Sequence, residues 1–141
     1  MILVGSENNS TWGFARSCTT PCETQGQRVH TAPMNQFAAH YPAATTLFLL
    51  TSTYGDGDAP ASANHFLARL AQASPDPKLR FAVLGFGDQQ FLHFCQFARD
   101  VDSAMSSWAG SARWRSPPST ASRHRNLHAG VPRPVRCWEW R

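Results

Sequence analysis

Five small hydrogen-bonding side chains follow the short apolar run ILVG at residues 2–5 and precede a predicted helix: Ser6, Asn8, Asn9, Ser10 and Thr11. The first N–H groups of a helix lack intrahelical partners and its dipole adds partial positive charge, so this junction can bind an anion. The absence of GxxxxGK[ST], and of any Lys or Arg before Arg16, argues against a P-loop. The pattern favours a phosphomonoester held by neutral donors. The alternative is a helix N-cap without a ligand.

Two later loops combine glycine with an aromatic residue. TSTYGDGDAP (51–60) places Tyr54 beside two glycines, and GFGDQQFLHFC (85–95) places Phe91 shortly after Gly87. Glycine lets the backbone approach a flat ligand closely, and an aromatic ring can stack on it. Together with the first loop, these two loops suit a phosphorylated planar ring clamped between two aromatic faces.

Alternating apolar elements predict the scaffold that positions these loops. Strands are expected at residues 2–5, 28–33, 45–52 and 79–87, and helices from about residue 11, around 63–70 and around 94–108. The third strand is apolar enough to be buried on both faces, as parallel strands are. We therefore predict an α/β fold, a doubly wound parallel sheet with helices on both faces and ligands at the carboxyl ends of its strands.

Length and charge restrict the class of protein. The 141 residues suit one domain, and the net charge of +4 is uneven, because residues 109–141 carry seven Arg and one Glu. Residues 1–108 are thus mildly acidic, so no nucleic-acid partner is expected, although a basic nucleic-acid-binding arm is an alternative for the tail. No run approaches the roughly 20 apolar residues that cross a bilayer, which predicts a cytoplasmic protein without direct membrane insertion.

The four cysteines predict neither a disulfide scaffold nor a metal site. Cys18 and Cys22 have the spacing of one helix face, and Cys95 is expected in the core. No metal ligands are therefore assigned.

The three loops together resemble those of the flavodoxin-like FMN-binding domain of diflavin reductases, the group of the sulfite reductase flavoprotein and cytochrome P450 reductase. GSENNSTWGFA is similar to the phosphate loop, TSTYGDGDAP to STYGxGxxP, and LGFGDQQFLHFC to LGxGxxxYxxFC. The resemblance covers residues 1 to about 109. It implies a flavodoxin-like sheet of strand order 2-1-3-4-(5) and FMN as the cofactor.

The resemblance also implies roles for residues. The first loop holds the FMN phosphate, Tyr54 and Phe91 stack on the isoalloxazine ring, and His93 is read as structural rather than as a proton donor. Phe91 replaces the usual Tyr, and Asp88 replaces the usual Asn and brings a carboxylate near the flavin. The implied cofactor-binding set is Ser6, Glu7, Asn8, Asn9, Ser10, Thr11, Ser52, Thr53, Tyr54, Gly55, Gly57, Phe86, Gly87, Asp88, Phe91, His93, Phe94 and Cys95. No catalytic residue is expected, because the flavin carries the redox chemistry.

The implied function is a one-electron transfer domain of an NADPH-dependent diflavin-type oxidoreductase. Its partners would be an FAD/NADPH reductase module and a redox acceptor protein, since the chain has no recognisable nicotinamide site of its own. Asp56, Asp58 and Asp88 should disfavour the anionic reduced flavin. Two alternatives stay open: a non-functional fragment unable to hold FMN, and a freestanding flavodoxin-like carrier or quinone reductase.

Two segments disagree with this fold. Pro21 falls inside the first predicted helix, where it costs about 3 kcal/mol. From residue 111 the chain loses apolar periodicity, so we expect a domain at 1–110, a disordered Arg/Pro/Trp-rich tail at 111–141 and no ordered fifth strand. Because CTTPC can be encoded by bases that read LHDAL in a shifted frame, we hypothesise two frame errors, the second placing the tail out of frame. Resequencing the locus tests this hypothesis.

Overall fold

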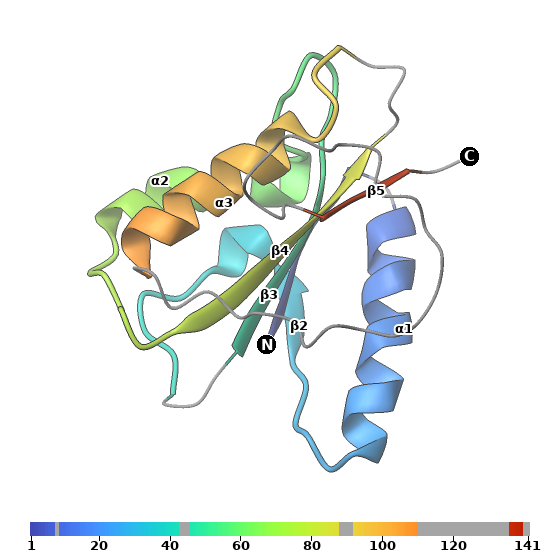
Figure 1. The fold of residues 1–141 in the computed structure, drawn as a ribbon, viewed down its shortest axis with the longest axis vertical. Helices are drawn as coiled ribbons and strands as arrows, with labels where there is room; N and C mark the ends of the chain where they lie inside the picture. The colour runs from blue at the N-terminus through green and yellow to red at the C-terminus, as the bar shows by residue number, and fades with distance from the viewer. Residues whose placement is uncertain (8, 43–45, 88–91, 110–135, 140–141) are drawn as a thin grey trace.

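The computed structural model describes residues 1–7, 9–42, 46–87, 92–109 and 136–139. Its centre is a parallel sheet of order β2-β1-β3-β4-β5 (Figure 1). The strands are β1 (Ile2–Gly5), β2 (Thr31–Pro33), β3 (Thr46–Ser52), β4 (Arg80–Gly87) and β5 (Arg136–Glu139). The strand order 2-1-3-4 confirms the predicted flavodoxin-like topology.

Helices cover both faces of the sheet, as predicted (Figure 1). On one face lies α1 (Ser10–Thr24), and on the other lie α2 (Phe66–Gln72) and α3 (Gln96–Trp108). Two short 3-10 turns, η1 (Met34–Gln36) and η2 (Ala61–Ala63), belong to the connections after β2 and β3. The sheet is therefore the middle of three layers.

Strand alternation divides the core between the two faces. Leu47 and Leu49 of β3 are fully buried in the cluster that includes Phe66, Phe97 and Val101 of α2 and α3. On the α1 face a smaller cluster joins Ile2, Val4, Ala15, Leu50 and Phe86. Each fully buried side chain of this size contributes about 1.5–3 kcal/mol. Both faces thus hold the strands rigidly where their carboxyl ends meet.

The first helix runs through Pro21 and ends at a glycine. Proline removes one N–H from the helical ladder, yet α1 extends to Thr24. Gly26, with φ of +76°, follows the helix, and the Gln27 N–H returns 3.1 Å to the Cys22 carbonyl. This left-handed glycine closure is the usual way to satisfy the last carbonyls of a helix.

The prediction that the fifth strand is missing is wrong. β5 pairs with β4 in parallel register, from Leu84↔Arg136 to Gly87↔Glu139. Without it, β4 would leave a row of backbone donors and acceptors unpaired at the sheet edge. Backbone pairing satisfies these groups and does not need the apolar periodicity for which the sequence was searched. Residues 110–135 and 140–141 lie outside the described residues, so the predicted disorder and frame shift of the tail stay predictions.

Two further properties follow from the described part of the chain. None of its helices is long and apolar enough to cross a membrane. Within the same residues, no group of three or more His, Cys, Asp or Glu side chains could hold a metal ion.

Candidate functional site

The carboxyl ends of three neighbouring strands bring the predicted loops to one edge of the sheet. In register, Gly5 of β1 pairs with Thr51 of β3, and Ser52 pairs with Phe86 of β4. The Ser52 hydroxyl also donates to the Gly5 carbonyl at 3.4 Å. The connections after β1, β3 and β4 consequently begin side by side.

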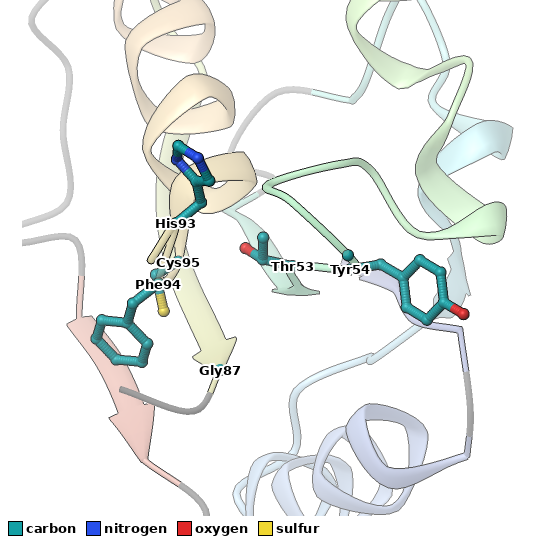
Figure 2. Close-up of a pocket in the computed structure, with 7 residues that line it drawn as sticks. Thr53, Tyr54, Gly87, His93, Phe94 and Cys95 are labelled. Carbon is teal, nitrogen blue, oxygen red and sulfur yellow. The ribbon is translucent and has the colours of Figure 1, made fainter. Parts of the chain in front are cut away.

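A cavity of about 390 Å³ opens between the loops after β3 and β4. Figure 2 shows Thr53 and Tyr54 on the β3 side and His93, Phe94 and Cys95 across from them at the approach to α3. Among the described residues, the lining is Thr53, Tyr54, Gly55, Gly87, His93, Phe94 and Cys95. All seven belong to the site residues predicted from the sequence.

The loop after β3 is a tight backbone hairpin. The Tyr54 N–H donates to the Asp58 carbonyl at 3.0 Å, and the Asp58 N–H donates back at 2.8 Å. Gly55 and Gly57 have φ of +50° and +110°, a conformation that favours glycine. The Tyr54 side chain is 57% exposed, and its ring points away from Phe94 (Figure 2). The hairpin thus presents an aromatic ring at the rim of the cavity.

The approach to α3 lies directly on β4. A Cβ built on Gly85 would lie 2.6 Å from the Ala98 Cβ and 3.2 Å from the Cys95 sulfur. A Cβ on Gly87 would lie 3.1 Å from the Phe94 ring. Cys95 is fully buried, as predicted, and adopts a left-handed conformation with φ of +53°. Such strain persists only where surrounding packing enforces it.

Two buried hydroxyls at the site have no hydrogen-bond partner in the described part of the chain: Thr11 Oγ1 in the first turn of α1, and Thr53 Oγ1 in the cavity. Thr11 is 1% exposed. A buried polar group without a partner is destabilising by about 1–3 kcal/mol, so each such group in a native fold needs an explanation.

The N-terminal end of α1 likewise has no side-chain cap among the residues described. Asn9 holds the N-cap position but makes no side-chain capping hydrogen bond, and no acidic side chain lies in the first turn among the residues described. The simple N-cap alternative therefore does not explain Asn9. The helix end keeps the partial positive charge that attracts anions.

The remaining predicted residues divide into three groups. Phe86 is buried and packs edge-on against Phe14, with ring centroids 5.2 Å apart, so its side chain belongs to the core. Asn8, Asp88 and Phe91 lie outside the described residues. The third group is described by the structure but does not line the cavity: Ser6, Glu7, Asn9, Ser10, Thr11, Ser52 and Gly57.

The sequence analysis did not single out Ser62. Its hydroxyl accepts a hydrogen bond from the Ser6 N–H at 2.7 Å, linking η2 to the loop after β1. No local sequence signal marks Ser62 for this role, because the bond joins residues that are 56 positions apart.

The sequence model of the flavodoxin family matches residues 2–113. The chain belongs to the flavodoxin family. Among solved structures, the Streptococcus pneumoniae TIGR4 flavodoxin superposes with a TM-score of 0.65 at 24% identity, covering 79% of this chain and 77% of that one. Oxidised flavodoxin 1 of Bacillus cereus gives 0.66 at 14% identity, covering 84% and 85%. These likenesses establish the flavodoxin fold.

Sequence relatives of this flavodoxin-family chain are the sulfite reductase [NADPH] flavoprotein alpha-components. That of Shewanella oneidensis is 34% identical over 115 residues, covering 79% of this chain and 19% of the relative. That of Bacillus subtilis is 30% identical over 112 residues, covering 77% and 18%. The chain thus spans about a fifth of the length of these curated relatives.

Proposed function

We propose that this flavodoxin domain binds FMN and transfers electrons one at a time within an NADPH-dependent, diflavin-type system. The observation that carries the proposal is the pair of buried hydroxyls of Thr11 and Thr53, which have no hydrogen-bond partner among the residues that the structure describes. One lies where an anion would meet α1, and the other lines a cavity at the carboxyl ends of the strands. FMN, when bound, supplies one-electron redox chemistry that side chains lack.

The donor set fits a phosphomonoester. The loop after β1 offers Ser, Asn and Thr side chains and the start of a helix, with no cation before Arg16. In our proposal Ser6, Asn8, Asn9, Ser10 and Thr11 hold the phosphate, and the Thr11 hydroxyl gains there the acceptor that the protein does not provide.

The cavity fits a flat aromatic ring. Tyr54 offers a stacking surface, and the backbone at Gly55 and Gly87 allows close approach. Phe91, outside the described residues, is proposed as the second stacking ring. Asp56 and Asp58 are exposed on the hairpin beside Tyr54 and place negative charge near the ring.

The proposed partners rest on the relatives, whose printed names contain both NADPH and flavoprotein. We propose that an FAD/NADPH reductase module supplies electrons and that a redox acceptor protein receives them. Cytoplasmic location stays a prediction.

The test is a titration of the purified chain with FMN, followed by flavin fluorescence and absorbance. We expect saturable binding, weakened much more by Tyr54→Ala than by Phe48→Ala, because Phe48 is a partly exposed residue in the amino half of β3. A protein that binds no FMN would contradict the proposal and favour the fragment alternative. NADPH oxidation without an added reductase would favour the freestanding quinone reductase.

A further inference from the structure

We propose that Ser62 and Glu7 position the phosphate-binding loop by tying it to η2, a role that rests on the proposed FMN function. Both side chains bridge the connection after β1 to the connection after β3. They are positioning residues, because they bond to protein backbone and act on a ligand only through it.

Ser62 fixes the backbone of Ser6 from two directions. Its hydroxyl oxygen accepts the Ser6 N–H at 2.7 Å and lies 3.0 Å from the Ser6 carbonyl oxygen, to which it can donate. The Val4 carbonyl oxygen is a second possible acceptor at 3.3 Å. The Ser62 hydroxyl thus pairs with the backbone N–H and carbonyl of Ser6, as a neighbouring strand does within a sheet. Ser6 is the first residue after β1.

Glu7 makes the second tie. Its Oε2 accepts the Ala61 N–H at 2.7 Å, at the first residue of η2. A free carboxylate in a loop that binds a phosphate would repel the ligand. The bond to Ala61 gives this negative charge a donor belonging to the protein and fixes where it lies.

The η2 turn is a firm anchor for both ties. The Asn35 side chain of η1 donates to the Ala61 carbonyl at 2.9 Å and accepts the His65 N–H at 2.9 Å. At the last residue of η2, the Ala63 Cβ would lie 3.0 Å from a Cβ built on Gly5. The turn η2 therefore packs closely against the end of β1. The loop after β1 is therefore bonded to a turn that is itself hydrogen-bonded to η1 and packed against β1.

The expected consequence is preorganisation. A loop already held in one conformation loses less entropy when its donors close on a phosphate. The ties should raise affinity for the phosphate end of the ligand and leave affinity for the ring unchanged. Riboflavin has the ring without the phosphate, so the ratio of the riboflavin Kd to the FMN Kd isolates the effect.

The experiment measures both Kd values for four variants of the full chain. Ser62→Ala should lower the ratio about five- to tenfold, the effect of one lost hydrogen bond, with riboflavin affinity held within about twofold. Glu7→Ala removes both the bond to Ala61 and the negative charge, so it is compared with Glu7→Gln, which removes only the charge: the ratio should be about five- to tenfold lower in Glu7→Ala than in Glu7→Gln. Glu7→Gln keeps an acceptor for Ala61 and should retain most of the ratio. The matched control is Ser107→Ala, which removes an exposed hydroxyl bonded to the Ser103 carbonyl near the end of α3.

A second readout needs no flavin. In the ligand-free chain, hydrogen exchange of the Ser6 amide should be at least about fivefold faster in Ser62→Ala, because the variant removes the acceptor of that N–H. If Ser62→Ala leaves hydrogen exchange of the Ser6 amide unchanged, the hydrogen bond between Ser6 and Ser62 is refuted. The positioning role alone would be refuted in either of two cases. Ser62→Ala could leave the preference for FMN over riboflavin unchanged, or it could weaken the affinity for both flavins equally. A wild-type chain that binds neither flavin would instead refute the proposed function.

Discussion

Gly57 lies against His93: a Cβ built on Gly57 would stand 3.2 Å from the His93 Cβ and 3.3 Å from the Gln96 Cβ. Gly57 belongs to the hairpin after β3, His93 belongs to the approach to α3, and Gln96 is the first residue of α3. The two segments that border the cavity therefore lie so close at this position that a side chain would crowd them.

Gly57→Ala should destabilise the domain and weaken FMN binding. The new methyl group meets His93 and Gln96, and its residue must hold φ of +110°, which L side chains rarely adopt. Backbone strain of this kind is worth about 1–3 kcal/mol. Urea unfolding measures the free energy of unfolding, and an FMN titration measures the loss of affinity.

Gly13→Ala is the matched control. Gly13 lies inside α1, and a Cβ there meets nothing within 4 Å. Alanine is the better helix former, so we expect a gain of about 0.5–1 kcal/mol in the free energy of unfolding. Equal behaviour of the two variants would show that close packing at Gly57 is unimportant.

Thr11→Val should separate stability from binding. Valine keeps the shape of threonine and removes a buried hydroxyl that has no partner, so the flavin-free domain should be stabilised by about 1 kcal/mol. If that hydroxyl binds the phosphate, FMN affinity should fall while riboflavin affinity stays constant. Thermal unfolding and paired titrations measure the two effects.

Thr51→Val is the comparison for this change. Thr51 is equally buried, but its hydroxyl donates to the Ser52 carbonyl at 3.1 Å. Its replacement should therefore destabilise the domain. A loss of stability in both variants would mean that the Thr11 hydroxyl does have a stabilising partner.

Asp58→Asn should raise the midpoint potential of the bound flavin. Asp58 is exposed beside Tyr54, where its negative charge opposes the addition of an electron to the ring. Solvent screens this charge, so the expected rise is on the order of tens of millivolts. Potentiometric titration measures it, and Asp76→Asn, on the segment before β4, serves as the control. A shift to lower potential would contradict the electrostatic role.

Because the Tyr41 phenol titrates, the free energy of unfolding of the domain should fall at high pH. Burial raises the pKa of the Tyr41 phenol above its ordinary 10.0, while the hydrogen bond from the Ala38 N–H acts in the opposite direction. A raised pKa in the folded state means that the folded domain disfavours the phenolate. The stabilising contribution is thus present below about pH 10 and is lost as pH rises through the folded-state pKa.

Tyr41→Phe removes this titration. It should be less stable than the wild type at neutral pH, because the Ala38 N–H loses its acceptor. The difference between the two proteins should shrink above about pH 10. Urea unfolding at several pH values measures the difference, and a constant gap would show that the phenol does not titrate as inferred.

The sequence predicted the elements that a single local signal, such as an apolar run, determines. Apolar runs located β1, β3 and β4, and the hairpin and glycine-aromatic motifs lie on the two loops that line the cavity. The roles predicted for their residues stay predictions. Strand β2 is shorter than predicted, Thr31–Pro33 in place of 28–33: its register with β1 begins at Thr31, just after the His30 carbonyl, which accepts the Ile2 N–H at 2.7 Å.

Other features depend on tertiary context. β5 is recruited by the free edge of β4 rather than by apolar periodicity, and α1 tolerates Pro21 within a packed helix. Phe86 has the sequence position of a ring-lining residue, yet strand alternation turns its side chain toward Phe14. The bond between Ser62 and Ser6 joins distant segments and leaves no local pattern.

The pairing of β5 with β4 also bears on how the domain is made. A ribosome releases β1, β3 and β4 well before residues 136–139, so the contact order of this last pairing is high. Until then the outer edge of β4 is exposed to neighbouring nascent chains. On a crowded polysome, two copies could pair through these edges. A pause in elongation between β4 and β5 should therefore favour aggregation over native closure.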